Sequence, residues 1–560
     1  MLVVVSLNYM DEIIAEIKKA GFKGKITKSL QTRDDYSHDA SMFEILPELV
    51  VFPEDSDDVS VLVGVVNKNQ EQYSNLSLTA RSAGTDMTGG AIGESIVMDF
   101  TKHFNKIFEV NSTHAVTQPG VYYRDFERET LKYGSIMPSY PASRDLCTVG
   151  GMVANNSGGE KSLEFGKTEK FVTELKAVFA DGKEYTVKPL NRQELKEKIS
   201  QNDFEGRIYK KVFDLVDSNY DSIKAAKPKV SKDSTGYHLW NVWDRETGIF
   251  DLNQAIIGSQ GTLAIITEIS FKLVPAPTHS GTLVVFLRKI DKLGMLINTV
   301  LKHNPATFEG FDNYTLMLSF KLFFYFRKTL GWWGMIKLGM QLIPDALMLF
   351  RGIPKMVLLI EFNGDSPDLV AQKVHKMRLA LGKYGKYALF EEDESEAKAR
   401  KFWIMRRQSF NILRSKVHDK HTAPFIDDLV VPPEHLPKFL PELREILDRY
   451  KLLATVAGHM GDGNFHVIPL MKIEETLERI KLAPSMREVN RLVIKYGGSL
   501  SGEHNDGMTR GPWLHQMYSP EMINNFKTLK NIFDPDNIFN PHKKTDAKWE
   551  YSMSHLRQHF

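Results

Sequence analysis

The chain has 560 residues, and its 72 lysines and arginines nearly balance its 70 aspartates and glutamates. This length predicts more than one domain, and the balanced charge gives no overall field that would attract nucleic acid. The single cysteine, Cys147, excludes an intrachain disulfide, a cysteine-ligated iron–sulfur cluster and a cysteine-based zinc finger. The N-terminus has no charged n-region and no small-residue cleavage site, so we expect no secretory signal and a cytoplasmic location.

Helical and extended segments alternate in the first half of the chain. Residues 1–45 are predicted to be a helical lead-in, and residues 49–53 a strand. Acidic residues at 54–58 supply the N-cap and first turn of a helix over 59–68. Two further strands, at 76–80 and 96–100, flank a glycine-rich loop. This order indicates an α+β or α/β domain.

The loop Arg81-Ser-Ala-Gly-Thr-Asp-Met-Thr-Gly-Gly90 has the composition of an anion-binding turn. Its glycines let backbone N–H groups approach a ligand, and its serine and threonines add hydroxyl donors, as a pyrophosphate requires. The dinucleotide fingerprint G-x-G-x-x-G and the P-loop motif are both absent from it. By itself the loop is more typical of a glycine-rich hairpin turn, which is the favoured alternative.

Two later segments also bring small residues together. Residues 137–159 form a proline-spaced loop, a short Gly-Gly helix and an Asn/Gly turn, which permits close approach to a large planar ligand. Residues 255–273 run from a Gly/Ser/Thr turn into an alternating strand. Pro275 and Pro277 follow, and we expect a domain boundary there.

The region after this boundary has a repeated strand–helix–strand order, which predicts a ferredoxin-like sheet with helices on one face. The expected strands and helices cover residues 281–287, 293–303, 307–311, 356–362, 367–384 and 387–391.

A basic, aromatic insertion, Tyr314 to Lys355, interrupts this order. It has no apolar run long enough to span a bilayer. Such a segment is typical of a membrane-interface helix, and packing on the cap domain or on a second subunit of a homodimer is the equal alternative.

Two histidines flank a glycine turn in Ala457-Gly-His-Met-Gly-Asp-Gly-Asn-Phe-His466, and Glu503 follows in Ser501-Gly-Glu-His504. Two histidines and a carboxylate are a suitable ligand set for a divalent metal with one open position. From the spacing alone, a purely structural role for His459 and His466 is the favoured alternative.

Three of these segments, RSAGTDMTGGA, CTVGGMVANNSGG and GSQGTLAIITEISFKL, resemble the FAD-binding domain of the vanillyl-alcohol-oxidase (PCMH-type) flavoprotein superfamily. The resemblance extends from about Tyr36 to the end of the chain. It implies FAD bound non-covalently, because no histidine stands at the loop positions that some members use to tether the flavin. The cofactor-binding residues implied are Arg81, Ser82, Ala83, Gly84, Thr85, Asp86, Thr88, Gly89, Pro141, Thr148, Gly150, Gly151, Asn155, Gly158, Gly159, Gly258, Gly261, Thr262, Ile265, Ile266 and Asn540.

The motifs G-H-x-G-D-G-N-x-H and S-G-E-H resemble those of the D-2-hydroxyacid dehydrogenases of this superfamily, which act on D-lactate, D-2-hydroxyglutarate or glycolate. The resemblance implies a divalent metal, commonly zinc, on His459, His466 and Glu503, with His504 as the catalytic base. It also implies that Arg406 binds the substrate carboxylate, and Asn464 is expected to add a hydrogen bond to substrate. A surface ion pair is the favoured role of the neighbouring Arg407.

The overall prediction is an α+β protein: a lead-in at 1–45, a two-part PCMH-type FAD-binding domain at 46–276, a cap domain at 277–500 and a C-terminal segment at 501–560 that returns to the flavin. Relatives that take a dicarboxylate have a lysine where this chain has Ile426, which favours D-lactate or glycolate over 2-hydroxyglutarate. A second departure is Asn505-Asp506, which stands before the glycine that directly follows Glu-His in the family.

Two alternatives keep the fold. One is an FAD-dependent transferase resembling the alkyl-dihydroxyacetonephosphate synthases, which have S-H-H-H-G where this chain has S-G-E-H; Glu503 favours the dehydrogenase. The other is a non-catalytic flavoprotein subunit anchored by the insertion. As electron acceptor we expect a quinone, an electron-transfer flavoprotein, a separate iron–sulfur subunit or oxygen, and a membrane quinone would require contact with the inner face of the membrane.

Overall fold

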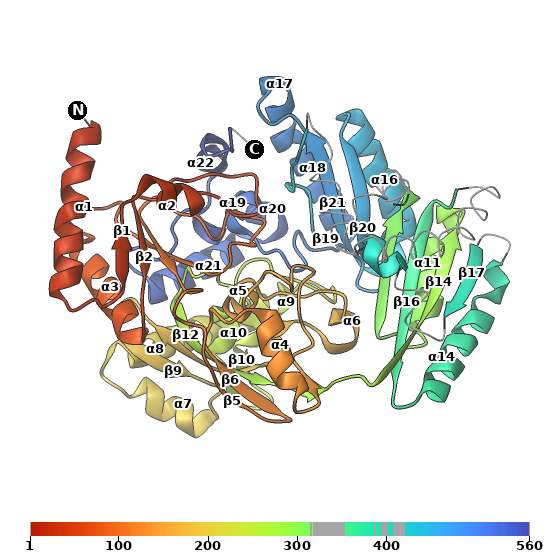
Figure 1. The fold of residues 1–560 in the computed structure, drawn as a ribbon, viewed down its shortest axis with the longest axis horizontal. Helices are drawn as coiled ribbons and strands as arrows, with labels where there is room; N and C mark the ends of the chain where they lie inside the picture. The colour runs from red at the N-terminus through yellow and green to blue at the C-terminus, as the bar shows by residue number, and fades with distance from the viewer. Residues whose placement is uncertain are drawn as a thin grey trace, which may run out of the picture.

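A computed structural model of the protein describes residues 2–313, 316, 353–385, 388–393, 401–406 and 420–558. The insertion predicted at 314–355 and Arg407 therefore lie outside the described residues, except for the insertion's ends. Figure 1 shows two lobes. The first contains the elements before β14 (His279–Leu287) and the C-terminal helices, and the second contains the elements from β14 to α18 (Leu482–Lys495).

The first lobe begins with helix α1 (Leu2–Lys19), as predicted, but strand β1 (Lys25–Thr27) then follows where only helix was expected. Helix α3 (Ser56–Asn69) has the predicted acidic N-cap, because the Asp55 side chain accepts from the backbone N–H of Asp58. Both helices share a core with a four-stranded sheet of order β1-β2-β4-β3. The remaining strands of this sheet are β2 (Leu49–Phe52), β3 (Leu78–Arg81) and β4 (Ile96–Asp99).

A second sheet of this lobe is antiparallel, with the order β5-β6-β12-β8-β9. Its long strand β12 (Ile265–Lys272) alternates in burial, as the sequence predicts. In sequence, the short helix α5 (Val149–Asn155) lies between strands β6 and β8 of this sheet. The other strands are β5 (Ile107–Val110), β6 (His114–Thr117), β8 (Val172–Val178) and β9 (Glu184–Val187).

The second lobe confirms the ferredoxin-like prediction. Its first four strands have the spatial order β17-β14-β16-β15, which is 4-1-3-2 in sequence, and all neighbours are antiparallel. Helices α11 and α14 provide the two crossovers. The bounds are α11 (Leu293–Leu301), β15 (Thr307–Asp312), β16 (Met356–Gly364), α14 (Pro367–Ala380) and β17 (Ala388–Asp393).

A hairpin not placed from the sequence extends this sheet. Strand β20 (Leu453–His459) pairs with β15, and β21 (Asn464–Met471) pairs with β20. The predicted histidine motif is therefore part of the cap sheet. Helix α16 (Leu436–Arg449) and α18 bury their apolar faces in the same core as α11 and α14.

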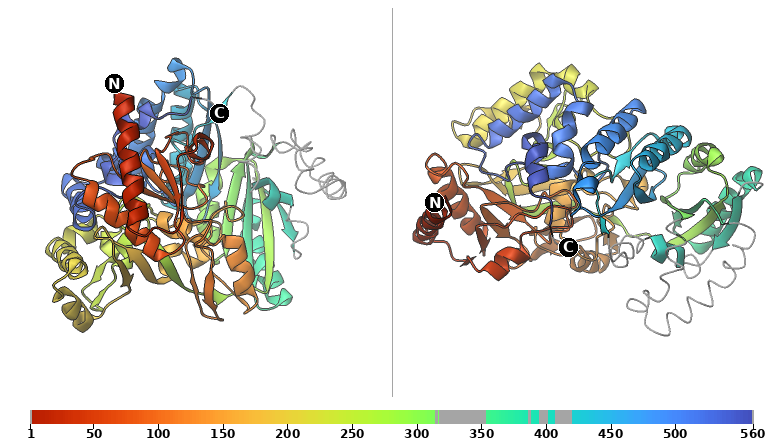
Figure 2. Two further views of the ribbon diagram at one scale, coloured as in Figure 1. Left: turned by 60° about the vertical axis from the view of Figure 1, so that its left-hand side comes forward. Right: turned by 90° about the horizontal axis from the view of Figure 1, so that it is seen from above.

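The C-terminal segment returns to the first lobe, where Figure 2 shows its blue helices packed. Helix α21 (Pro520–Phe533) shares the core of the second sheet through Phe526, Leu529 and Phe533. Phe539 then pairs with Leu78 of β3. None of the helices in the described part of the chain has the length and hydropathy needed to cross a bilayer.

Candidate active site

A cavity of about 880 Å³ lies where the three predicted FAD segments meet the cap sheet. This volume is in the upper part of the range found for ligand pockets. Thirteen predicted cofactor residues line it, namely Arg81, Ser82, Ala83, Gly84, Thr85, Asp86, Pro141, Thr148, Gly150, Gly151, Asn155, Gly261 and Ile266. The other predicted cofactor residues lie outside its lining, namely Thr88, Gly89, Gly158, Gly159, Gly258, Thr262, Ile265 and Asn540. We call the part of the cavity that the thirteen lining residues form the loop end.

Side-chain amides and one carboxylate join the three segments of the loop end. Asp86 Oδ2 accepts from the backbone N–H groups of Thr88 at 2.9 Å and Gly90 at 2.7 Å, which closes the first loop. Asp86 Oδ1 accepts from Asn155 Nδ2 of α5 at 3.0 Å. Gln260 of the third segment donates to Asn155 Oδ1 at 3.3 Å and to Thr88 Oγ1 at 3.1 Å. The loops are therefore fixed to one another by residues beside the cavity.

Arg81 lines the cavity but its guanidinium is engaged with the protein. Nη1 donates to the carbonyl of Ala91 at 3.2 Å and Nη2 to that of His38 at 2.9 Å, with the ring of Tyr36 packed against it. Arg81 therefore fastens the base of the first loop. The anion-binding part of the prediction rests instead on the backbone of residues 82–90.

The glycines of the loop end explain how a large ligand fits. A Cβ on Gly150 would lie 2.3 Å from Pro119 Cβ, so this helix must pack closely on its neighbour. A Cβ on Gly151 would meet nothing closer than 3.6 Å and would extend toward the cavity. Small side chains thus leave a wall of backbone and hydroxyl groups, which is the surface that FAD requires.

Asn540 has a structural place in this arrangement. Its amide nitrogen donates to the carbonyls of Gly90 at 2.8 Å and Gln260 at 2.7 Å. It therefore joins the first and third segments from behind, outside the cavity lining, rather than facing the cavity as predicted.

The opposite part of the cavity contains the predicted metal and catalytic residues, and we call it the histidine end. His459 closes strand β20 and His466 lies on β21, so the hairpin brings their rings to 5.4 Å between centroids. Each histidine places its Nε2 3.3 Å from the same oxygen, Oε1 of Glu503. The three predicted metal ligands are thus brought together, although His459 itself does not line the cavity.

Carboxylates behind the rings fix their orientation. Glu309 of β15 lies 2.5 Å from His459 Nδ1. Asp427 lies between the other two histidines, with Oδ1 3.2 Å from His466 Nδ1 and Oδ2 2.8 Å from His504 Nδ1. Nδ1 of His459 and Nδ1 of His466 each share a hydrogen bond with a carboxylate, and Nδ1 of His504 lies at ion-pair distance from one. This arrangement leaves the Nε2 atoms to bind a metal or accept a proton.

Asp428 is the alternative ligand suggested by geometry. Asp428, His466, Glu503 and His504 offer ligand atoms that all lie within 4.8 Å of one another. Asp428 is already occupied, however, since it accepts from Ser501 Oγ, from the backbone N–H groups of Glu503 and His504 and from Asn464 Nδ2. We therefore favour His459, whose Nε2 faces Glu503, and assign Asp428 to folding the Ser501–His504 loop.

The role predicted for Asn464 is not supported by its position. Asn464 is fully buried, donates to Asp428 Oδ1 at 2.9 Å and to the carbonyl of Leu429 at 3.2 Å, and does not line the cavity. Asn464 pairs with His459 in the hairpin register, so the two side chains lie on the same face of the sheet, and neither of them lines the cavity. Asn464 supports the loop instead of contacting substrate.

The histidine end favours positive charge. Burial alone would lower the pKa of His466, but the Asp427 and Glu503 carboxylates raise it to about 10. Burial alone would raise the pKa of Glu503, but Lys232 and His459 hold it well below its usual range. Protons and metal ions compete for the same ligand atoms, so these shifts indicate a site suited to a cation.

Buried carboxylates are concentrated around the histidines, namely Glu309, Asp427, Asp428, Asp462 and Glu503. The buried cations beside them are Lys167, Lys232, Arg406 and Arg510. Imidazole nitrogens and carboxylate oxygens gathered in this way suit a divalent metal.

Arg406 lines the cavity at the histidine end, as its predicted role requires. Its Nε lies 3.0 Å from Glu309 Oε2, so the carboxylate that orients His459 also orients the guanidinium. The remaining walls of this end are small or apolar, and their residues are Ile404, Thr455, Ala457 and Ile468. Ile426, used in the substrate argument, is buried outside the cavity lining.

Four buried residues of this site were not singled out by the sequence analysis: Glu309, Asp427, Asp428 and Lys232. Glu309 carried a detectable signal, since it is an acid within the otherwise apolar strand Thr307–Asp312, where every position is buried. Asp427 and Asp428 directly follow Ile426, which was the residue of this segment used to predict the substrate. Lys232 lies in a polar stretch with no periodic pattern to mark it.

Models of two known protein domains match the two parts of the chain. Residues 47–188 match the model of an FAD binding domain, and residues 276–544 match that of the C-terminal domain of FAD linked oxidases.

Among curated proteins, the chain is 28% identical over 548 residues to a D-2-hydroxyglutarate dehydrogenase of Pseudomonas putida, covering 96% of this chain and 52% of that protein. It therefore spans about half the length of that relative. It is 27% identical to the glycolate oxidase subunit GlcD of Bacillus subtilis, covering 91% of both chains. A D-lactate dehydrogenase of Anaerostipes hadrus is 24% identical, with 95% of this chain and 97% of that protein covered.

Solved structures show the same fold. A 4-ethylphenol oxidase of Gulosibacter chungangensis superposes with a TM-score of 0.67 at 16% identity, covering 97% of this chain and 98% of the other. An alkyldihydroxyacetonephosphate synthase superposes with a TM-score of 0.65 at 18% identity, covering 95% of this chain and 86% of the other. At these identities the likeness establishes architecture and leaves the reaction open.

Proposed function

We propose that the chain, whose two parts match an FAD binding domain and the C-terminal domain of FAD linked oxidases, oxidises a D-2-hydroxy acid to the 2-oxo acid with the help of FAD and a divalent metal, zinc being the expected ion. The observation that carries the proposal is the convergence of His459 and His466 on one oxygen of Glu503, at one end of a cavity whose other end has the predicted FAD segments. A bound flavin supplies the hydride acceptor that no side chain can provide, and a bound metal supplies a Lewis acid for the hydroxyl oxygen.

The loop end would hold FAD through the backbone of residues 82–90, the hydroxyl of Thr148 and the glycines of α5. The histidine end would hold the metal through His459, His466 and Glu503. Both assignments rest on donor chemistry: backbone N–H groups and hydroxyls suit a pyrophosphate, and imidazole with carboxylate suits zinc.

His504 is the base in this proposal. Its Nδ1 faces Asp427 at 2.8 Å, so Nε2 is the nitrogen that accepts the substrate hydroxyl proton. The positive charge that forms on the ring is then stabilised by the Asp427 carboxylate. His504 stacks on His466 at 5.0 Å between ring centroids, which places the base beside a metal ligand.

Arg406 would orient the substrate by pairing with its carboxylate. Ile404, Ala457 and Ile468 then surround the rest of the substrate with apolar surface. This lining supports a small or apolar side chain at the 2-position, and D-lactate or glycolate are the best candidates. The support from Ile426 is indirect, because this side chain does not reach the cavity.

Anaerobic mixing tests the proposal. Purified protein would be mixed with a panel of D- and L-2-hydroxy acids, including D-lactate, glycolate and D-2-hydroxyglutarate, and the flavin absorbance followed. We expect bleaching by D-lactate or glycolate and none by L-lactate. If no D-2-hydroxy acid reduces the flavin, the dehydrogenase function is wrong, and a transferase or a non-catalytic flavoprotein subunit takes its place.

The electron acceptor is proposed only by class. This chain's single cysteine cannot build an iron–sulfur relay, so electrons would pass from the flavin to a quinone, to a protein carrier or iron–sulfur subunit, or to oxygen. Turnover measured with a soluble quinone, with an artificial dye and with oxygen alone would separate these classes. Contact with a membrane surface depends on the insertion at 314–355 and is tested by vesicle co-sedimentation.

A further inference from the structure

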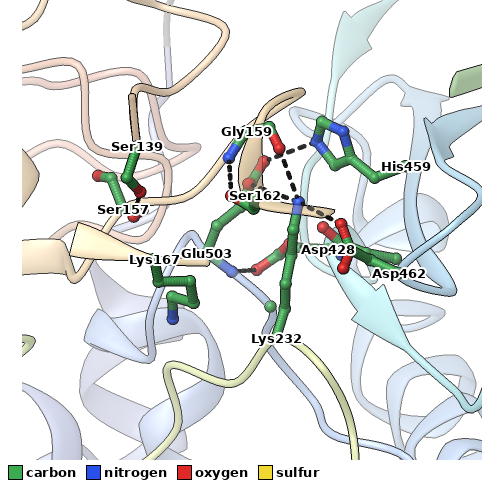
Figure 3. A network of polar contacts seen from close by, with 12 residues as sticks. Ser139, Ser157, Gly159, Ser162, Lys167, Lys232, Asp428, His459, Asp462 and Glu503 are labelled. Atoms are coloured by element: carbon green, nitrogen blue, oxygen red, sulfur yellow. Dashed lines mark hydrogen bonds and ion pairs between the residues drawn. The ribbon is translucent and has the colours of Figure 1, made fainter. Parts of the chain in front are cut away.

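Lys232 is a fully buried lysine behind the histidine end, and Figure 3 shows it beside Gly159, Asp462 and Glu503. Its ammonium lies 3.1 Å from the carbonyl oxygen of Gly159, 3.4 Å from Oε2 of Glu503 and 3.4 Å from Oδ2 of Asp462. A lysine has three N–H donors, and these three acceptors match them. A buried ammonium is tolerated only when paired in this way.

The two oxygens of the Glu503 carboxylate have different partners. Oε2 faces the Lys232 ammonium, whereas Oε1 faces His459 and His466 at 3.3 Å each. A carboxylate held at one oxygen by a cation can offer only the other oxygen to a metal. Glu503 is therefore set up as a ligand through a single oxygen before any ion binds.

The backbone around Lys232 is attached to the loop that carries Glu503. The N–H of Ser234 donates to the carbonyl of Ser501 at 2.9 Å, and the N–H of Gly236 donates to Asp506 Oδ2 at 2.8 Å. Asp233 Oδ1 accepts from Ser499 Oγ at 2.6 Å. These bonds fix the 231–236 segment and the 499–506 loop as a unit, so the ammonium is not free to leave Glu503.

We propose that Lys232 is a positioning residue that holds Oε2 of Glu503, so that Oε1 alone is presented to a divalent metal between His459 and His466. This inference rests on the proposed function, since it assumes the metal at these ligands. Lys232 does not contact substrate or the reacting atoms in this role. It sets the number of oxygens that Glu503 contributes and keeps the ligand in place while the site is empty.

Lys232→Met tests the role, because methionine keeps an unbranched side chain of similar length and removes the charge. Zn²⁺ affinity of the FAD-loaded protein would be measured by competition with a chromophoric chelator. Loss of an outer-shell partner typically weakens metal binding 10- to 100-fold, and we expect a change of about that size. Lys232→Arg, which keeps the charge, should restore most of the affinity.

A Co²⁺ spectrum gives a readout that loss of stability would not produce. Cobalt bound through one oxygen of Glu503 should have the intense visible bands of a low coordination number. In Lys232→Met the carboxylate is free to bind through both oxygens, so we expect weaker bands from a higher coordination number. FAD content and gel filtration would establish that the variant is folded.

Lys167→Met is the matched control. Lys167 is also a buried lysine beside this segment, but it donates to the carbonyl of Asp233 and to Ser234 Oγ instead of to Glu503. Its replacement removes a buried ammonium of the same neighbourhood without removing a contact to Glu503, so the Zn²⁺ affinity should fall clearly less than in Lys232→Met.

Unchanged zinc affinity and an unchanged cobalt spectrum in Lys232→Met would overturn the role of Lys232 and leave the proposed function standing. An equal loss in Lys167→Met would overturn it too, since the effect would then be general destabilisation. If the unaltered protein binds no zinc, or still binds it after His459→Ala, the proposed metal site itself fails and the role of Lys232 fails with it.

Discussion

The two ends of the cavity are lined by different kinds of chemical groups. The loop end consists mainly of glycines, hydroxyls and backbone N–H groups, and one carboxylate, Asp86, is used to fold a loop. The histidine end consists of charged and titratable side chains, each held by another buried side chain. The loop end has space for a large ligand, and the histidine end has a concentration of charged groups. Replacements should therefore damage the two ends in different ways.

The largest effect is expected at the histidine end, from Glu503→Gln. The amide keeps the shape but removes the charge that joins His459, His466 and Lys232. Metal assistance is worth several kcal/mol, so turnover should fall by about 10³-fold or more. Metal content and steady-state turnover would be measured, with FAD content as the control.

Removal of the metal from the unaltered protein should reproduce this loss, and zinc should reverse it. FAD content should stay unchanged in both cases, because Glu503 belongs to the other end of the cavity. Full turnover after exhaustive chelation would contradict the roles of His459, His466 and Glu503.

His504→Gln should have the next largest effect. A positioned base typically contributes 10²- to 10⁴-fold, and we expect a loss of about 10³-fold in flavin reduction by substrate. Zinc binding should be retained, since His504 Nδ1 is engaged with Asp427 and its ring lies outside the favoured ligand set. Stopped-flow reduction and metal analysis would be made on the same preparation; loss of zinc together with activity would mean that His504 is a ligand.

Gly151→Leu is expected to impair FAD binding and spare zinc binding, which is the reverse of the pattern expected for Glu503→Gln. The new side chain would extend into the loop end without meeting the protein closer than about 3.6 Å at Cβ. It should fill part of the cavity, weaken FAD binding by at least about tenfold and leave zinc binding intact, because one to two kcal/mol of lost contact is already that large. Gly64→Ala, at a helix glycine with nothing within 4 Å, is the control and should retain FAD.

Asn540→Ala should have the smallest effect. It removes three hydrogen bonds behind the loop end, namely those donated to the carbonyls of Gly90 and Gln260 and the one accepted from Thr79 Oγ1. Leaving buried polar groups unpaired costs about 1–3 kcal/mol, so we expect a lower melting temperature and faster release of FAD on heating. Turnover at saturating FAD should change little; a loss as large as that of His504→Gln would place Asn540 in the reaction itself.

The same contrast explains what the sequence could predict. The loop end is encoded locally, so the segments at 81–90, 148–159 and 258–266 were recognisable. The contacts by which Asn540 and Arg81 hold these loops were not predicted, and their roles in cofactor binding stay predictions. At the histidine end the motif residues were recognisable, but their partners were not. Glu309 and His459 are 150 positions apart, and Lys232 and Glu503 are 271 apart. Contacts over such distances depend on the tertiary fold.

The fold shows this division as well. The β-α-β order of the second lobe predicted its four ferredoxin-like strands, because strands and helices are local features. The pairing of β20 with β15 was not predicted, since edge pairing depends on register between distant segments. This pairing is what carries the histidine motif into the cap sheet.

The placement of the three metal ligands has a mechanical consequence. His459 and His466 lie on the sheet of the second lobe, whereas the loop of Glu503 is hydrogen-bonded to both lobes, to Asp428 in the second and to the 231–236 segment in the first. An ion shared by these residues would add a removable link between the two lobes to these hydrogen bonds. By thermodynamic linkage, whatever free energy the ion gains on binding also resists their separation. The availability of metal would then affect how strongly the two lobes are held together as well as the rate of turnover.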